Sequence, residues 1–369
     1  MDSELERARA LFLDGVGHYQ AGRLPQAEQA FAAALVLTPG RPSVLTNLGV
    51  VRLKLGRLPE GLALLQQALA QEPDNTEALG HCGTALADLG RPAEALAHFD
   101  RALALDPSAP APWMFRGNVL KDLGRPQEAA ASFREALARG GDPQLLAYYL
   151  AGVEAGAVPA QPPRLYVEAL FDGYATGFDQ HLQQALRYDA PQVLVQRIAA
   201  AGSRFRNALD LGCGTGMAGP LLRPLAERLT GVDLSANMLD QARALAVYDA
   251  LEHADALEFL AAAPQAFDCV LAADVFIYVG ELSQVFRALA ARMSAGGVFA
   301  FTVEESTQGE LELRPTLRYA HSEAGIRRLA QEHGFRVAAM ERRPVREEQR
   351  QPIPGLFFWL ERGPATRPS

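Results

Sequence analysis

The chain has 369 residues, 49% of them hydrophobic and 21% charged, which is enough for two domains with ordinary hydrophobic cores. Its formal net charge of −8 argues against a phosphate-neutralising surface, so no nucleic-acid partner is expected. Cys82, Cys213 and Cys269 form no C-x-x-C pattern, which predicts neither disulfides nor a metal site. The charged start, MDSELERARA, and the lack of a long apolar run predict a cytoplasmic protein that does not enter a membrane.

A repeat with a period of 34 residues fills the first part of the chain. Gly-Arg pairs recur at Gly22-Arg23, Gly56-Arg57, Gly90-Arg91 and Gly124-Arg125. The same period holds for glycine at 15, 49, 83 and 117, for a large apolar residue at 31, 65, 99 and 133, and for alanine at 34, 68, 102 and 136. This pattern resembles the tetratricopeptide repeat family, in which each repeat is a pair of helices. We therefore predict an all-α solenoid over residues 1–156, with about four repeats and a capping helix from about Gln144 to Ala155.

The resemblance implies that the first helix of each pair lines a concave face. The side chains at those positions are mixed: Phe12, Val16, Tyr19, Thr46, Val50, Leu53, Glu77, Thr84, Met114, Asn118 and Lys121. They do not form the basic clamp that some relatives use for carboxyl-terminal peptides. A groove for a peptide or partner protein is the favoured interpretation, and a solenoid that docks or dimerises is the alternative.

A proline-rich segment, VPAQPP at residues 158–163, follows the repeats. Such a segment is typical of a domain boundary. We predict a linker over residues 157–164 and a second domain over residues 165–369.

The second domain contains a glycine-rich turn. Residues 207–217 read NALDLGCGTGM, an apolar strand with Asp210, then Gly212, Gly214 and Gly216, then a helical pattern from Met217. Glycine permits positive φ and close approach of a ligand to the backbone. A second strand ends at Asp233, about 20 residues later, the usual offset of an acid that binds ribose hydroxyls. The pair predicts a site for a nucleotide-like ligand.

Asp210 distinguishes between two kinds of nucleotide ligand. Gly214, Gly216 and Gly219 also fit the dinucleotide pattern G-x-G-x-x-G, but a carboxylate at Asp210 would repel a pyrophosphate and suits an amino group. Residues 210–216, DLGCGTG, resemble the first motif of class I S-adenosylmethionine-dependent methyltransferases. The segments SANML at 235–239, HADA at 253–256 and FDCV at 267–270 resemble later segments of that family, in its order.

The methyltransferase resemblance implies S-adenosylmethionine as the cofactor. It assigns Asp210 to the methionine amino group, Asp233 to the ribose and Asp255 to the adenine amine. The predicted cofactor-binding residues are Asp210, Gly212, Cys213, Gly214, Gly216, Asp233, Leu234, Met238, Asp255, Ala256 and Asp274. Nothing marks the Cys213 thiol as activated, so we expect it to be structural.

The predicted fold of the second domain is α/β and Rossmann-like. Alternating strand and helix patterns from residue 207 to 303 predict a parallel sheet with helices on both faces, which binds ligands at the carboxyl ends of its strands. The family adds a mostly parallel, seven-stranded sheet, closed by a hairpin that we place at residues 335–342 and 356–360.

Three residues are candidates for catalysis. Asp274 follows the fourth strand and could orient an acceptor hydroxyl or amine, or cap the next turn. His321 could act as a base at neutral pH, or only precede the helix that starts at Ser322. Tyr174 lies in an aromatic segment that in this family folds over the cofactor, where it could exclude water or pack on the sheet. Tyr278 is either near the acceptor or a core aromatic.

The sequence thus predicts an S-adenosylmethionine-dependent methyltransferase whose acceptor is a protein or peptide recruited by the repeats. One alternative is a small-molecule methyltransferase whose repeats serve docking or dimerisation. Another is an inactive scaffold with the same fold, which the intact Asp210, glycines and Asp233 disfavour.

Overall fold

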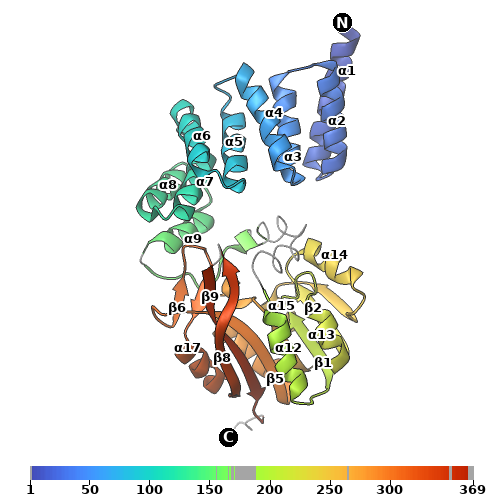
Figure 1. Cartoon of the computed structure of the whole chain (residues 1–369), viewed down its shortest axis with the longest axis vertical. Helices are drawn as coiled ribbons and strands as arrows, with labels where there is room; N and C mark the ends of the chain where they lie inside the picture. The colour runs from blue at the N-terminus through green and yellow to red at the C-terminus, as the bar shows by residue number, and fades with distance from the viewer. Residues whose placement is uncertain are drawn as a thin grey trace. The chain divides into compact units, whose positions relative to one another are not determined.

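The computed structural model describes residues 2–154, 156–164, 166–167, 170, 188–263, 266–348 and 351–364. The chain forms two compact units, Met1–Ala155 and Gly156–Ser369 (Figure 1). In the described part of the chain, no helix combines the length and apolar character needed to span a membrane.

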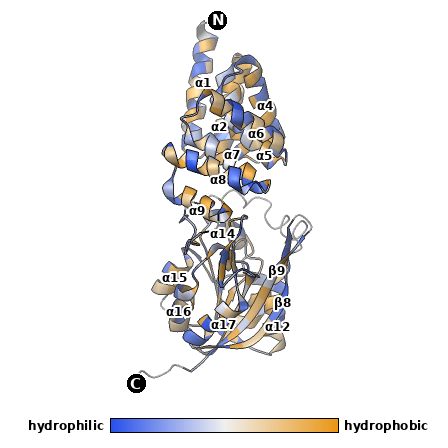
Figure 2. Ribbon diagram, turned by 90° about the vertical axis from the view of Figure 1, so that its left-hand side faces the viewer, coloured by the Kyte–Doolittle hydropathy of each residue, from blue (hydrophilic) through white to orange (hydrophobic). Residues whose placement is uncertain are grey.

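Consecutive helices pair throughout the first unit, as the 34-residue period predicted. They are α1 (Asp2–Gln20), α2 (Leu24–Leu37), α3 (Pro42–Lys54), α4 (Leu58–Gln71), α5 (Thr76–Asp88), α6 (Pro92–Leu105), α7 (Pro110–Asp122), α8 (Pro126–Ala138) and α9 (Pro143–Val153). Colouring by hydropathy shows hydrophobic and hydrophilic positions mixed along the helices that are labelled in the first unit (Figure 2), as expected when one face of a helix packs on its neighbours.

Glycine within the first helix of each repeat allows the two helices of a pair to approach. A Cβ added at Gly117 would lie 2.4 Å from the Phe133 ring, and one at Gly83 would lie 2.7 Å from Phe99. Glycine is also needed where a helix ends, as at Gly90, whose φ of +72° is left-handed. Both glycine positions recur because the first lies against a large apolar side chain of the second helix and the second ends a helix with left-handed backbone.

Several residues predicted for the concave face belong instead to the core of the repeats. Thr46 and Val50 are buried, and Phe12, Val16, Tyr19 and Leu53 pack against buried clusters that join neighbouring helix pairs. Glu77 is exposed, and Thr84, Met114, Asn118 and Lys121 are half-buried. The large apolar side chains on the first helices therefore hold the solenoid together, and polar side chains supply more of its accessible face.

The described part of the second unit contains a nine-stranded sheet. Its strands are β1 (Phe205–Leu211), β2 (Ala226–Asp233), β3 (Ala250–His253), β4 (Phe267–Ala272), β5 (Met293–Glu305), β6 (Leu311–Leu313), β7 (Tyr319–His321), β8 (Phe335–Glu348) and β9 (Gln351–Arg362). The order is β3-β2-β1-β4-β5-β7-β6, and β9 pairs with both β5 and β8. The prediction of seven strands missed β6 and β7. Each has only three residues, which is too few to leave an alternating pattern in the sequence.

The pairing of the sheet is mostly parallel, as predicted. Strands β1 to β5 and β7 run parallel to their neighbours in the central order, whereas β6, β8 and β9 pair antiparallel. The β8–β9 hairpin is longer than expected, because it begins at Phe335 and continues to Arg362.

Helices cover both faces of the sheet, each over its own core cluster. The helices are α12 (Ala190–Ala200), α13 (Gly219–Leu222), α14 (Ala236–Ala244), α15 (Ala256–Ala262), α16 (Ser283–Arg292) and α17 (Glu323–Glu332). One cluster packs α15, α16 and α17 against Leu209 and Leu211 of β1, and the other packs α12 against Ala208. Successive β1 residues point to opposite faces, so Asp210 lies on the α12 side.

The structure differs from the prediction at the helix expected to begin at Met217. Only α13 forms, over Gly219–Leu222, and a 3₁₀ turn at Arg223–Leu225 leads directly into β2. Pro224 explains the early stop, because proline lacks the N–H that continues a helix. The glycine turn is therefore held by backbone hydrogen bonds to Val232 and by the Asp233 side chain rather than by a long helix.

Candidate functional site

A cavity of about 950 Å³ opens at the carboxyl ends of β1, β2 and β4. Ten of the eleven predicted cofactor-binding residues line it: Asp210, Gly212, Cys213, Gly214, Asp233, Leu234, Met238, Asp255, Ala256 and Asp274. The eleventh, Gly216, does not. The sheet topology brings these residues together, because parallel neighbours end at the same edge.

The glycine turn after β1 uses left-handed backbone at three positions. Gly212, Gly214 and Gly216 have φ values of +69°, +54° and +89°. A Cβ at Gly212 would lie 2.5 Å from Val275 Cγ2, whereas one at Gly214 would meet nothing within 4 Å. Gly214 therefore faces open space, and Gly212 is required for packing. Gly216 closes the turn through its N–H, which donates to the Cys213 carbonyl at 2.9 Å.

Asp233 ties the turn to the end of β2. Its Oδ2 accepts the N–H of Gly214 at 2.8 Å, and its Oδ1 accepts the N–H of Ser235 at 2.9 Å. Burial raises the pKa of Asp233, and these backbone N–H donors act in the opposite direction. The carboxylate is thus oriented at the cavity wall by groups close to it in sequence.

Asp210 is 2% exposed, and burial raises its pKa to about 7. The hydroxyl of Tyr248 donates to Asp210 Oδ2 at 2.6 Å. Sequence reasoning missed Tyr248, which lies in the connection between α14 and β3 and outside every motif. An aromatic residue in that connection is no signal by itself.

Asp255 is the N-cap of α15 as well as a cavity residue. Its Oδ1 accepts the N–H groups of Leu257 at 2.8 Å and Glu258 at 3.2 Å.

Cys213 is buried, and burial raises the pKa of its thiol, which agrees with the structural interpretation.

Asp274 occupies a different setting at the end of β4. Its φ of +59° is left-handed, and its N–H donates to Thr302 Oγ1 at 2.8 Å. Its carboxylate accepts two hydrogen bonds from Arg346 Nη1, at 2.9 and 3.0 Å. Burial raises the pKa of Asp274, and the neighbouring Arg346 and Arg318 oppose that rise.

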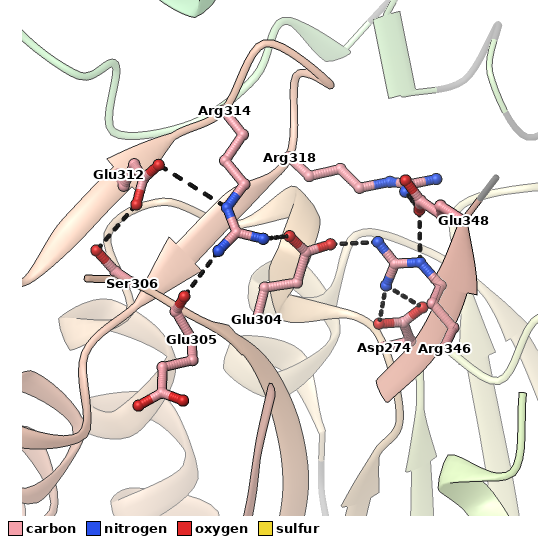
Figure 3. A network of polar contacts seen from close by, with 9 residues as sticks. All are labelled: Asp274, Glu304, Glu305, Ser306, Glu312, Arg314, Arg318, Arg346 and Glu348. Carbon is pink, nitrogen blue, oxygen red and sulfur yellow. Dashed lines mark hydrogen bonds and ion pairs between the residues drawn. The ribbon is translucent and has the colours of Figure 1, made fainter. Parts of the chain in front are cut away.

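Arg346 is the centre of a charged network (Figure 3). It is 2% exposed and binds three carboxylates: Asp274, Glu304 and, through Nε at 2.7 Å, Glu348. Arg314 bonds to Glu304 at 2.5 Å from its other side, and Arg318 pairs with Glu348. Of these, Asp274, Arg318, Arg346 and Glu348 line the cavity. The network was not predicted, because its arginines come from β8 and from the connection between β6 and β7, far from any motif.

His321 does not face this cavity. It lies on β7, is 4% exposed, and its Nε2 is 2.9 Å from the Gly280 carbonyl oxygen. Burial lowers its pKa to about 4, so it is neutral at physiological pH and enclosed. The prediction of His321 as a base beside the substrate is wrong for that reason.

Tyr278 does line the cavity, and burial raises its pKa. Tyr174 lies outside the described residues.

Comparisons with known proteins agree with this architecture. A methyltransferase domain family matches residues 209–301, and a tetratricopeptide repeat family matches residues 2–42, 46–110 and 116–160.

The curated relatives are malonyl-[acyl-carrier protein] O-methyltransferases. That of Enterobacter lignolyticus is 32% identical over 136 residues, 37% of this chain and 52% of that protein. That of Salmonella typhimurium is 30% identical over 161 residues, 44% of this chain and 60% of that protein. The chain therefore spans about half the length of the curated relatives it matches.

Solved structures resemble each part of the chain at low identity. Magnesium protoporphyrin IX methyltransferase from Synechocystis with bound SAH has a TM-score of 0.43 and 21% identity, covering 54% of this chain and 99% of that one. The MamA protein has a TM-score of 0.36 and 20% identity, covering 40% of this chain and 80% of that one. The predicted fold class is confirmed, because helical repeats precede an α/β domain with a mostly parallel sheet, and the chain matches a tetratricopeptide repeat family and a methyltransferase domain family over separate parts of its length.

Proposed function

We propose that the second unit transfers a methyl group from S-adenosylmethionine to an acceptor. The observation that carries the proposal is the bond between Asp233 and Gly214, which joins the glycine turn to the end of β2 on the wall of one cavity. The remaining lone pairs of the Asp233 carboxylate suit the two ribose hydroxyls. Asp210 and Asp255 supply further carboxylates on the same wall, for the methionine ammonium and the adenine amine.

The donor itself supplies the reactive group, a methyl carbon bound to a positive sulfur. The chain's residues need only bind the two reactants, align the acceptor atom with that carbon and exclude water. When bound, S-adenosylmethionine would supply the methyl group: the carbon–sulfur bond would break, the bond to the acceptor atom would form, and the proton of an acceptor hydroxyl or amine would pass to solvent.

We assign Asp274 a role in orienting the acceptor rather than in removing its proton. Its carboxylate already accepts two hydrogen bonds from Arg346, and this ion pair opposes the rise in pKa that burial causes. The left-handed backbone and the bond to Thr302 hold it in one position. A carboxylate fixed in this way can accept a hydrogen bond from an acceptor hydroxyl or amine without moving.

Calorimetric titration with S-adenosylmethionine, S-adenosylhomocysteine and NADH tests the cofactor. The first two should bind and NADH should not. Asp233→Ala should weaken binding by about 2 kcal/mol, roughly 30-fold, through the loss of charge-assisted bonds to the ribose.

Asp268→Ala is the matched control for Asp233→Ala. The Asp268 carboxylate also accepts two backbone N–H groups, from Arg206 at 2.8 Å and Asn207 at 3.0 Å, but it does not line the cavity. Its cofactor affinity should match that of the unmodified chain. Unchanged affinity in Asp233→Ala would overturn the cofactor assignment, and the inactive scaffold would become the better explanation.

For the acceptor, we favour a protein or peptide that the repeats recruit. The curated relatives are named for a malonyl group on a carrier protein, so a small group presented by a protein is one acceptor that suits both units. A methyltransferase that acts on a free small molecule is the second candidate. Comparing acceptor KM for the full chain and for a chain that starts at Gly156 separates them. A recruiting enzyme should show a raised KM without repeats, and a small-molecule enzyme should not.

A further inference from the structure

Tyr248 is placed by a connection that is itself anchored on both sides. It follows Ala246, whose φ is +53°, and it precedes Asp249. The Asp249 carboxylate accepts the N–H of Leu229 at 2.7 Å and Nη1 of Arg223 at 2.6 Å. These bonds tie the connection to the start of β2, so the Tyr248 side chain is fixed relative to the sheet.

The hydroxyl of Tyr248 reaches the buried carboxylate on the neighbouring strand. It donates to Asp210 Oδ2 at 2.6 Å, and it is the one side-chain donor to Asp210 that we find among the residues that the structure describes. Asp210 lies where the methionine ammonium group of the proposed cofactor is expected. A phenol hydroxyl in this position leaves the second carboxylate oxygen for that ligand.

The ring of Tyr248 packs against three glycines. A Cβ added at Gly216, Gly219 or Gly231 would lie 3.1, 2.8 or 2.9 Å from the ring. Gly216 and Gly219 are two of the three glycines that resemble a dinucleotide-binding motif. Their spacing is therefore explained by a tyrosine that needs space against the turn, and no phosphate group is required.

The charged and titratable groups around Asp210 disfavour its ionised form. Burial is the largest influence, the nearby Asp233 carboxylate acts in the same direction, and together they raise the Asp210 pKa to about 7. The bond from Tyr248 opposes them. The other groups that face Asp210 are the thiols of Cys213 and Cys269 and the hydroxyl of Tyr188, all uncharged at neutral pH because burial raises their pKa values.

We propose that Tyr248 is a positioning residue of the cofactor site, whose hydroxyl orients the Asp210 carboxylate toward the cofactor's ammonium group and whose ring fixes the glycine turn. This inference rests on the proposed function. It adds the residue that keeps Asp210 available as an anion near neutral pH.

Tyr248→Phe separates the two parts of the proposal, because it removes the hydroxyl and keeps the ring. At pH 7, its affinity for S-adenosylhomocysteine should fall about ten- to a hundredfold, the usual worth of one hydrogen bond to a charged group. The sign follows from the bond: without it the Asp210 pKa rises, so less carboxylate is present at pH 7. At about pH 9 most of the carboxylate is ionised in both proteins, and the difference should narrow. An equal loss at both pH values, or no loss, would overturn the proposal.

Two further variants control for a general effect of losing a hydroxyl. Tyr149→Phe removes the hydroxyl that contacts Asn118 in the repeats, and it should bind with unchanged affinity. In an Asp210→Asn background, Tyr248→Phe should weaken binding no further, because the group that it positions is already changed. A full additional loss in that background would mean that Tyr248 acts independently of Asp210.

A measurement without ligand distinguishes failure of this inference from failure of the proposed function. In protein labelled with carbon-13 at the aspartate carboxyl, Asp210→Asn identifies the Asp210 signal. The titration midpoint of that signal should be higher in Tyr248→Phe than in the unmodified chain. If the midpoint moves but no cofactor binds, the proposed function is wrong and the link between Tyr248 and Asp210 stands. If the midpoint does not move, the inference is wrong whatever binds.

Discussion

The two ends of the cavity hold their carboxylates by different means. At the cofactor end, Asp233 and Asp255 accept backbone N–H groups from residues within about 20 positions in the chain. At the other end, Asp274 depends on Arg346, 72 residues away. A short sequence motif is enough to predict backbone donors that lie near a carboxylate in the chain. A long-range ion pair can be recognised only once the fold has brought its two residues together. The carboxylates held by backbone N–H groups are therefore recognisable in the sequence, whereas the side-chain partners of Asp210 and Asp274 are visible only in the structure.

The largest expected effect comes from breaking the Asp274 end. Arg346→Met should lower the free energy of unfolding by about 3–5 kcal/mol, because it leaves buried carboxylates of Asp274 and Glu304 without their shared partner. Denaturant unfolding followed by Trp359 fluorescence, in a Trp113→Phe background, reports on the second unit alone. Arg342→Ala is the control, because its ion pairs with Glu305 and Glu323 are at the surface, and it should leave the midpoint unchanged. An Arg346→Met protein as stable as the control would mean that the network is not a determinant of stability.

A smaller effect is expected from the cofactor end, and it should differ between two glycines. Gly212→Ala should cost about 2–4 kcal/mol of stability, since it combines left-handed strain with a clash against Val275. Gly214→Ala has the strain without the clash and should cost about 1 kcal/mol. The same unfolding assay measures both. Calorimetry should show a larger loss of cofactor affinity in Gly214→Ala than its stability change explains, because its Cβ projects into open space at the cavity. Equal stability losses would contradict the packing role assigned to Gly212.

The third expected effect is a pH dependence of stability at the cofactor end. Asp210 has a folded pKa of about 7, above its ordinary value of 3.8, so between these values the folded state binds the proton more tightly than the unfolded state. The stability that this group contributes should be greatest below about pH 4, fall as the pH rises toward 7, and stay constant above it. Asp210→Asn should remove this part of the slope when unfolding is measured across that range. A slope unchanged in Asp210→Asn would show that Asp210 titrates as an ordinary surface carboxylate.

The repeats and the methyltransferase-type fold were predictable because their signals are local. Each repeat makes the same contacts, so Gly83 beside Phe99 and Gly117 beside Phe133 share one spacing. The pair of Asp210 and Asp233 was predictable because the glycine turn directly follows the strand that carries Asp210 and is bonded to Asp233.

What the sequence did not reveal depends on pairing across the sheet. Arg346 reaches Asp274 only because β9 connects β8 to β5, and Tyr248 reaches Asp210 only because β2 lies beside β1. The wrong prediction, His321, has the same origin: β7 is too short to recognise, and its place in the sheet buries the imidazole. The short α13 shows that one proline can outweigh a helical pattern.

The proline-rich segment before the sheet belongs to the cavity as well as to the boundary. The Tyr319 hydroxyl donates to the Pro159 carbonyl at 2.9 Å, and the Glu281 N–H donates to the Ala160 carbonyl at 2.8 Å. Gln161, Pro162 and Arg164 then line the cavity wall. A truncation that starts at residue 165 would therefore delete part of the binding site together with the repeats, and its loss of activity would be misread as a need for recruitment.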